Sequence, residues 1–150
     1  MYEKYGDKVR FLMIYIREAH PATAEQTAND AGWKAIGDVV FHQPTTLADR
    51  RKLAETACTF WDVKFPALVD TIQPNAGDTY NAHPNRIYLI DTGGKIVYRG
   101  VRGPQGAMAR PAEVALREQL GLPEGDYASD ERAFPMPRPA GEGGAQRPQR

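Results

Sequence analysis

The sequence predicts a mixed α/β fold, in which short buried strands alternate with amphipathic helices. Two apolar runs of strand character, at 9–16 and 86–91, stand on either side of a helical pattern that begins near Thr46. A hairpin signal of one threonine and two glycines follows at 92–94. Strands that alternate with helices indicate parallel crossovers, and the closing hairpin adds one antiparallel strand.

Length and composition are those of one ordinary globular domain, with 150 residues, 41% hydrophobic and 25% charged. The formal net charge is zero, so we expect no nucleic acid partner, and no run is long enough to cross a membrane. The single cysteine, Cys58, excludes an internal disulfide framework and a multi-cysteine metal site. Because no signal-peptide pattern opens the chain, we expect a cytoplasmic location.

The first part of the chain predicts a helix end, a buried strand and a long connection. Residues 1–7 are typical of the last turns of a helix, which Gly6 would close. The run VRFLMIYI at 9–16 predicts a fully buried strand. The connection at 20–44 is rich in Pro and Gly, with room for a short helix near 22–29, and its length suggests a functional loop.

A clear helix follows this connection. Thr46 can cap it, and Asp49 three residues later nearly completes a capping box. One face is apolar, and Cys58 lies on it, so we interpret this cysteine as a small buried hydrophobe. We expect the charged residues of 46–58 to form a solvated face.

Several short elements come next along the chain. Residues 66–71 predict a strand, and the Asp70-Thr71 pair at its end could cap the next helix, expected at 75–82. Residues 86–91 and 95–99 predict the two strands of an antiparallel hairpin. The segment at 89–93 imitates an aspartic-protease signature, but a hairpin turn explains its Asp and Gly better.

A last helix and a tail complete the chain. Pro111 suits the first helical position, and Gly121 suits the position just after the helix. Residues 123–150 are rich in Pro and Gly and should be disordered, which leaves one domain at 1–122.

This order of elements describes a thioredoxin-like, three-layer α/β fold that lacks its first strand and most of its first helix. In that fold the reactive cysteine or selenocysteine belongs to the missing piece, where a helix N-terminus stabilises the anion.

The richest segment is MIYIREAHP at 13–21, because a buried strand ends there in Glu18 and His20. In open α/β sheets, ligands bind at the carboxyl ends of the strands. A plainer interpretation leaves both residues as solvated polar groups. The three histidines lie too far apart for a metal spacing, and His83 is interpreted as a loop residue.

Several separated segments also carry a resemblance to a known family. They are YIREAHP at 15–21, Gly32-Trp33, Gln43 with TLADR at 46–50, LVDTIQPNAGDTY at 68–80, NRIYLI at 85–90, and the Gly-rich stretch at 98–106. Together they resemble the iodothyronine deiodinase family, including its bacterial deiodinase-like members, over roughly residues 1–121.

The resemblance implies a thioredoxin-fold reductase of aromatic carbon–iodine bonds. A selenolate or thiolate attacks the iodine, and a thiol cosubstrate recycles it without any bound cofactor. Glu18 and His20 would be a proton relay and substrate clamp, Tyr15 would line the pocket, and Arg86 would hold the far end of the substrate. A histidine near neutral pKa suits the protonation of the leaving carbon, and arginine suits a carboxylate.

The sequence departs from the family pattern in three respects. No cysteine or selenocysteine precedes the first strand, so the nucleophile is expected upstream of Met1. Pro44 replaces the family's second histidine, and His42, two positions earlier, is a candidate substitute for substrate binding. The connection after His20 is longer than in animal members.

We therefore expect reductive dehalogenation of an iodinated or halogenated phenol with a thiol donor. Two alternatives stay open. A peroxiredoxin- or thioredoxin-like thiol oxidoreductase is suggested by FPALVDT followed by YLIDTGGKIVYRG. A non-catalytic thioredoxin-like binding module is the other. A sheet without its first strand would expose an edge, which suggests a homodimer.

Overall fold

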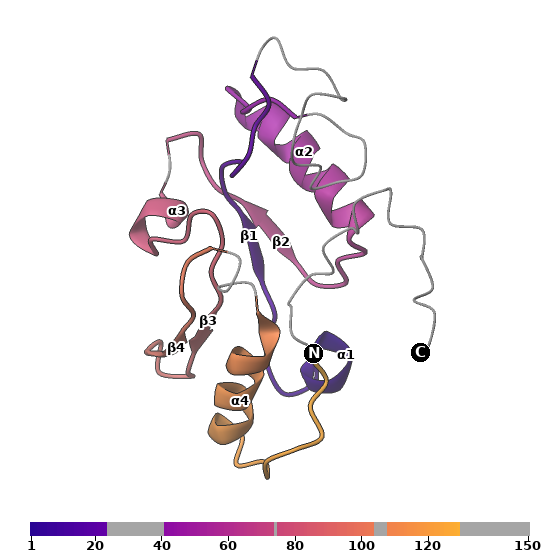
Figure 1. Ribbon diagram of the computed structural model, residues 1–150, viewed down its shortest axis with the longest axis vertical. Helices are drawn as coiled ribbons and strands as arrows, with labels where there is room; N and C mark the ends of the chain where they lie inside the picture. The colour runs from indigo at the N-terminus through magenta and orange to yellow at the C-terminus, as the bar shows by residue number, and fades with distance from the viewer. Residues whose placement is uncertain (24–40, 74, 104–107, 130–150) are drawn as a thin grey trace, which may run out of the picture.

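The computed structural model describes residues 1–23, 41–73, 75–103 and 108–129. Most of the helix expected near 22–29 lies outside these ranges. The mixed α/β class is confirmed, whereas the thioredoxin-like arrangement stays a prediction. Figure 1 shows the helices and strands, which follow in the order α1 (Tyr2–Tyr5), β1 (Met13–Tyr15), α2 (Leu47–Phe60), β2 (Ala67–Val69), α3 (Ala76–Thr79), β3 (Tyr88–Ile90), β4 (Ile96–Arg99) and α4 (Ala109–Gln119).

Strands β1 and β2 form a parallel pair that lies between α2 and α4 (Figure 1). Each strand is shorter than the runs at 9–16 and 66–71 that predicted it. The ladder stops at Pro66, whose carbonyl accepts a hydrogen bond from the Met13 N–H at 3.0 Å. Proline has no N–H of its own, so it cannot extend the pairing further.

Helix α2 lies in the connection between β1 and β2 and packs against β2. Its predicted cap is confirmed, since Thr46 Oγ1 accepts a hydrogen bond from the Asp49 N–H at 3.1 Å. None of the helices described is long and apolar enough to cross a membrane. A buried cluster under α2 consists of Phe41 and Ala57, with Tyr15, Leu53 and Trp61 packed against it.

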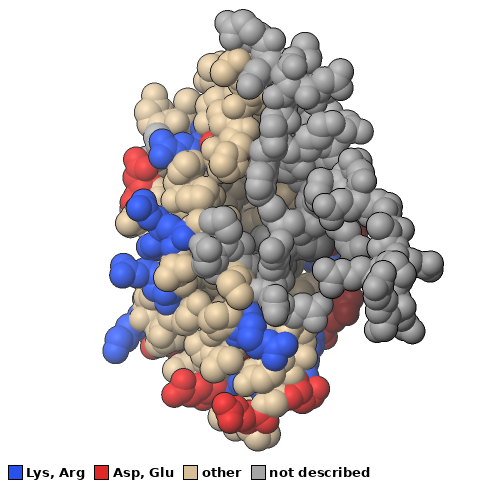
Figure 2. All heavy atoms as spheres, in the orientation of Figure 1, with Lys and Arg blue, Asp and Glu red and all other residues tan. Residues whose placement is uncertain are grey.

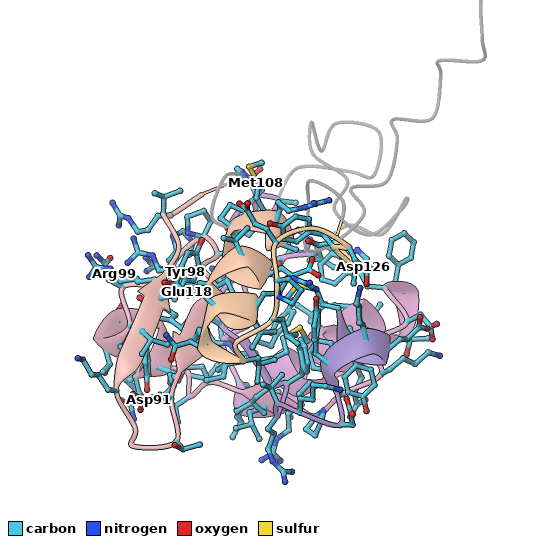
Figure 3. All side chains as sticks on the ribbon, turned by 90° about the horizontal axis from the view of Figure 1, so that it is seen from below. Asp91, Tyr98, Arg99, Met108, Glu118 and Asp126 are labelled. Carbon is cyan, nitrogen blue, oxygen red and sulfur yellow. The ribbon has the colours of Figure 1, made fainter. Side chains whose placement is uncertain are left out.

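Strands β3 and β4 form the predicted antiparallel hairpin, which within the described residues is a sheet separate from β1–β2. Asp91 Oδ1 organises its turn by accepting hydrogen bonds from the N–H groups of Gly93 and Lys95, both at 2.9 Å. Gly94 has a φ of +81°, where glycine is favoured. Helix α4 lies against the hairpin, and Figure 3 shows Tyr98 and Arg99 on that side of α4.

Helix α4 begins two residues earlier than predicted, at Ala109 rather than Pro111. Pro111 is tolerated as the third helical residue because the first four N–H groups of a helix have no acceptor within it. The predicted stop at Gly121 is confirmed by its φ of +65°. The Gly121 N–H donates to the Glu118 carbonyl at 3.1 Å and the Leu122 N–H to the Arg117 carbonyl at 2.9 Å, which is a Schellman motif.

Residues 123–129 return along α4 toward α1, although the sequence assigned them to a disordered tail. The Arg117 guanidinium donates to the Pro123 and Asp126 carbonyls, and the buried Glu113 carboxylate accepts from the Ser129 N–H at 2.7 Å. Asp126, labelled in Figure 3, pairs with Lys4 of α1 at 2.7 Å. Charged groups of α4 therefore hold this segment, while 130–150 lie outside the described residues.

Candidate functional site

The carboxyl end of β1 brings the phenol of Tyr15 and the carboxylate of Glu18 into contact. The Tyr15 hydroxyl donates a hydrogen bond to Glu18 Oε1, and both side chains are half-buried. The backbone of Tyr15 is fixed as well, because its carbonyl accepts from the Asp70 N–H at 2.9 Å. Two of the residues predicted from the sequence therefore form one hydrogen-bonded pair.

The surroundings of this pair favour the protonated form of both groups. Burial raises the pKa of Glu18, and the hydrogen bond from Tyr15 and the charge of Arg50 only partly offset this effect. Burial also raises the pKa of Tyr15, and the neighbouring Glu18 raises it further. Tyr15 thus stays a hydrogen-bond donor at neutral pH, while Glu18 is a weaker acid than a free glutamate, as proton transfer near neutral pH requires.

Gln43 holds the backbone of Glu18 at two points. The Glu18 N–H donates to Gln43 Oε1 at 3.1 Å, and Gln43 Nε2 donates to the Glu18 carbonyl at 3.3 Å. This pairing fixes the chain just after β1 has ended. In the sequence, Gln43 is notable only as part of the family resemblance, because no local feature of the residue indicates a partner 25 positions away in the chain.

Arg50 of α2 lies close to the pair and is only 3% exposed. Its guanidinium donates to the backbone carbonyls of Asp70, at 3.3 Å, and Thr71. The expectation that the charged residues of 46–58 form a solvated face is wrong for Arg50, because the carbonyls at the end of β2 require donors. The positive charge of Arg50 also favours the ionised form of Glu18.

Asp70 fixes the turn that leads from β2 into α3. Its carboxylate accepts hydrogen bonds from the backbone N–H groups of Thr71 and Ala76, both at 3.0 Å, and of Gly77 at 2.9 Å. The predicted capping role of Asp70 is therefore confirmed. A Cβ at Gly77 would lie 3.3 Å from Asp70 Oδ2, so this close approach favours glycine.

Cationic and titratable side chains gather beside the backbone of Glu18. The half-buried His83, in the loop after α3, lies near this backbone, and its pKa is lowered by burial and by the charges of Arg17, His20 and Arg102. Arg102 is itself held by Asn81 Oδ1 at 3.1 Å. The exposed His20 therefore has a second imidazole near it, that of His83, which the sequence predicted to be a loop residue.

The two remaining predicted site residues have other contacts. His42 Nδ1 lies 3.2 Å from the Ala22 carbonyl, so His42 joins the two ends of the long connection beside Gln43. Arg86 Nη1 lies 3.3 Å from the hydroxyl of Tyr88, and the Tyr88 ring packs edge-on against Tyr80 at 5.3 Å. No contact found between described residues joins Arg86 to Glu18.

Within the described residues, Cys58 is poorly suited to act as a nucleophile, and no group of side chains is suited to bind a metal ion. Cys58 is half-buried on α2, and burial raises the pKa of its thiol. A raised pKa disfavours the thiolate that a nucleophile or metal ligand requires. Between the described residues, no three His, Cys, Asp or Glu side chains come together in a way that could hold a metal ion.

Comparison with known proteins gives consistent matches. The family model of iodothyronine deiodinase matches residues 1–118. Thyroxine 5-deiodinase of Bos taurus is 32% identical over 129 residues, which cover 81% of this chain and 38% of the relative. The Rattus norvegicus and Homo sapiens thyroxine 5-deiodinases are 33% and 32% identical over 110 residues, covering 69% of this chain and 31% of each relative. The matched part of the chain thus covers less than two-fifths of the length of each of these relatives.

Proposed function

The chain belongs to the iodothyronine deiodinase family, and on that basis we propose that it acts in the reductive removal of iodine, or another halogen, from a phenol. The observation that supports this most is the hydrogen-bonded Tyr15–Glu18 pair at the carboxyl end of β1, with His20 two residues further on. The relatives are named for thyroxine. For this chain the proposed substrate is the wider class of halogenated phenols.

In the proposed reaction, a thiolate or selenolate attacks the iodine, so that a sulfur–iodine or selenium–iodine bond forms and the carbon–iodine bond breaks. The electron pair of the broken bond stays on the ring carbon, which takes up a proton. We propose His20 as the donor of this proton and Glu18 as the group that replenishes it. Two cosubstrate thiols then become a disulfide, so aryl iodide and two thiols give arene, iodide, a proton and disulfide.

The nucleophile is proposed to precede Met1, in the first strand and helix of a thioredoxin-like fold. Cys58 is the single cysteine of the sequence, and burial raises the pKa of its thiol, which is opposite to what an attacking thiolate requires. The DNA upstream of Met1 should therefore contain an in-frame cysteine or UGA codon after a strand-like segment. An unrelated reading frame there would refute this part of the proposal.

The activity itself is tested with the protein extended by that upstream segment. Supplied with a dithiol, it should release iodide from 2,6-diiodophenol, measured with an iodide-selective electrode. Glu18→Gln should lower the rate by about 100-fold, as is typical for loss of a proton-transfer group. Glu55→Gln, which removes an exposed carboxylate from α2, is the matched control and should leave the rate unchanged.

A second candidate function is a non-catalytic binding module, and the raised pKa of Cys58 favours it for residues 1–150 alone. The extended protein distinguishes the two. If it releases no iodide and reduces no disulfide, the binding module is the better interpretation. Consumption of peroxide without release of iodide would instead indicate a peroxiredoxin-like activity.

We also propose that the chain forms a homodimer through the apolar side chains of β1 and β2. Ile14 and Leu68 lie opposite each other in the ladder and are 38% and 53% exposed. Sedimentation equilibrium should then show a dimer that Leu68→Lys dissociates. A monomer at all concentrations would refute the proposal.

A further inference from the structure

The two small sheets each have an unpaired inner edge. Within the described residues, β1 pairs only with β2, and β3 pairs only with β4. Figure 1 shows β1 and β3 as the inner strands, with β2 and β4 on the outside. We propose that one further β-strand, supplied by the protein upstream of Met1, lies between β1 and β3 and joins the two sheets into one. This inference rests on the proposed function, which places the nucleophile in that upstream segment.

The hydrogen bonds of β1 identify its unpaired backbone groups. The Met13 N–H donates to the Pro66 carbonyl at 3.0 Å. The Tyr15 carbonyl accepts from the Asp70 N–H at 2.9 Å. Because the backbone groups of successive residues in a strand point to opposite edges, the N–H and carbonyl of Ile14 point away from β2. No hydrogen bond found between described residues involves these two groups of Ile14.

Strand β3 has an unpaired edge for the same reason. The Ile87 carbonyl, just before β3, accepts from the Gly100 N–H at 2.9 Å, so the backbone of Ile87 points to the partner strand. The N–H and carbonyl of the next residue, Tyr88, therefore point away from β4. Ile14 on β1 and Ile90 on β3 are 38% and 47% exposed. Unpaired backbone groups beside exposed apolar side chains are a template for another strand.

The outer edge of the hairpin differs from these inner edges. Strand β4 ends in Arg99 and follows Lys95 directly. Figure 2 shows Lys and Arg side chains along the side of the molecule that carries the hairpin. Charged side chains on an edge strand hinder the pairing of a further strand. Neither β1 nor β3 contains a charged residue, so the inner edges lack this protection.

The order of elements identifies which strand occupies the inner edge of β1. Helix α1 directly precedes β1 in the chain. Two strands joined through a helix are typically parallel neighbours in one sheet. Since β2 already occupies one edge of β1, a strand that precedes α1 has the inner edge available. The other edge of that strand then faces β3.

A strand at this place also determines what lies beside the candidate site. Parallel strands have their carboxyl ends at the same edge of a sheet, where ligands bind. Strand β1 ends at Tyr15, whose hydroxyl donates to Glu18. The residues that follow the added strand therefore lie on the same side of the sheet as this pair.

Amide hydrogen exchange, measured by NMR on ¹⁵N-labelled protein, tests the position of the strand. Residues 1–150 are compared with the protein extended by its own upstream segment. The Ile14 and Tyr88 amides should exchange rapidly in residues 1–150 and roughly 100-fold more slowly in the extended protein. The Met13 and Gly100 amides already have backbone acceptors and are the matched controls, which should be protected in both proteins.

A synthetic peptide with the sequence of the upstream strand tests the two edges separately when it is added to residues 1–150. In a strand between two others, alternate residues bond to opposite neighbours. N-methylation of either alternate set blocks one edge and should weaken binding by roughly tenfold. One methylated peptide should leave the Ile14 amide unprotected, and the other should leave the Tyr88 amide unprotected.

A protein variant tests the apolar part of the interface. Ile90→Lys should weaken binding of the unmodified peptide, because a charge then lies on the inner strand. Val114→Lys places the same charge on α4, at a position that is 42% exposed, and should leave binding unchanged. Equal binding by the two variants contradicts the inference.

Other results would also overturn it. They are upstream DNA that encodes no strand-like segment, Ile14 and Tyr88 amides that are already protected in residues 1–150, protection of one edge only, or a methylated set without effect. Iodide release by the extended protein is measured separately. Iodide release with unprotected inner edges would leave the proposed dehalogenation standing and refute the added strand, whereas two protected edges without iodide release would do the reverse.

Discussion

Replacing Glu113 with Gln should destabilise the fold by about 3 kcal/mol, because this carboxylate is fully buried and binds several donors. It accepts hydrogen bonds from the Tyr5 hydroxyl at 2.7 Å, from the Ala128 N–H at 2.6 Å, and from the N–H and hydroxyl of Ser129. Burial alone would raise the pKa of Glu113. The donors outweigh burial and lower the pKa from 4.5 to about 2.

The magnitude follows from this pKa. At about 1.4 kcal/mol for each pH unit, the fall from 4.5 to about 2 corresponds to about 3 kcal/mol. Because the pKa is lower in the folded than in the unfolded chain, acidification adds protons to the unfolded chain first. The contribution of Glu113 is therefore complete above about pH 5 and is lost as the pH falls toward about 2.

Urea unfolding, followed by tryptophan fluorescence between pH 7 and pH 3, measures both consequences. Glu113→Gln should be less stable at pH 7 and should lose less of its remaining stability on acidification. Glu118→Gln removes an exposed carboxylate from the same helix and should change stability by less than about 0.5 kcal/mol. If the two variants are equally stable at pH 7, or if Glu113→Gln keeps the full acid dependence, the reasoning is refuted.

Three other predictions concern single positions. Tyr15→Phe removes the donor that lowers the pKa of Glu18, so this carboxyl should titrate at higher pH in ¹³C NMR; an unchanged titration would contradict the contact. Gly121→Ala should cost about 1 kcal/mol in urea unfolding, since its φ of +65° suits glycine, and a neutral result would argue against the Schellman motif. The Cys58 thiol should react with a disulfide reagent more slowly than free cysteine and speed up in urea; fast reaction in the folded chain would show an accessible thiolate.

The elements that the sequence predicted well depend on residues close together in the chain. The cap by Thr46, the hairpin at 92–94 and the stop at Gly121 each involve partners within a few positions. Element ends were less predictable. The start of α4 depends on which N–H groups lack acceptors, and Pro111 is compatible with more than one early position.

The candidate site likewise contains residues that one short motif indicates and residues that only the folded chain brings together. Tyr15 and Glu18 are three residues apart, so one motif could indicate both. Arg50, Gln43 and His83 reach the site from other segments, and only the folded chain shows this. The charge pattern of α2 predicted a solvated Arg50 because a helical pattern contains no information about unpaired carbonyls at the end of β2.

The protonation of Glu18 depends on the same bonds that build the scaffold. Burial raises its pKa, whereas the hydrogen bond from Tyr15 and the charge of Arg50 lower it. The pKa of Glu18 is therefore higher than that of a free glutamate but lower than that of a buried carboxyl without such partners. Arg50 can do this because the Asp70 and Thr71 carbonyls hold its guanidinium. Those carbonyls are in turn placed by the Asp70 carboxylate, which caps the start of α3. A substitution that loosens this cap should therefore alter the acidity of Glu18 without touching it.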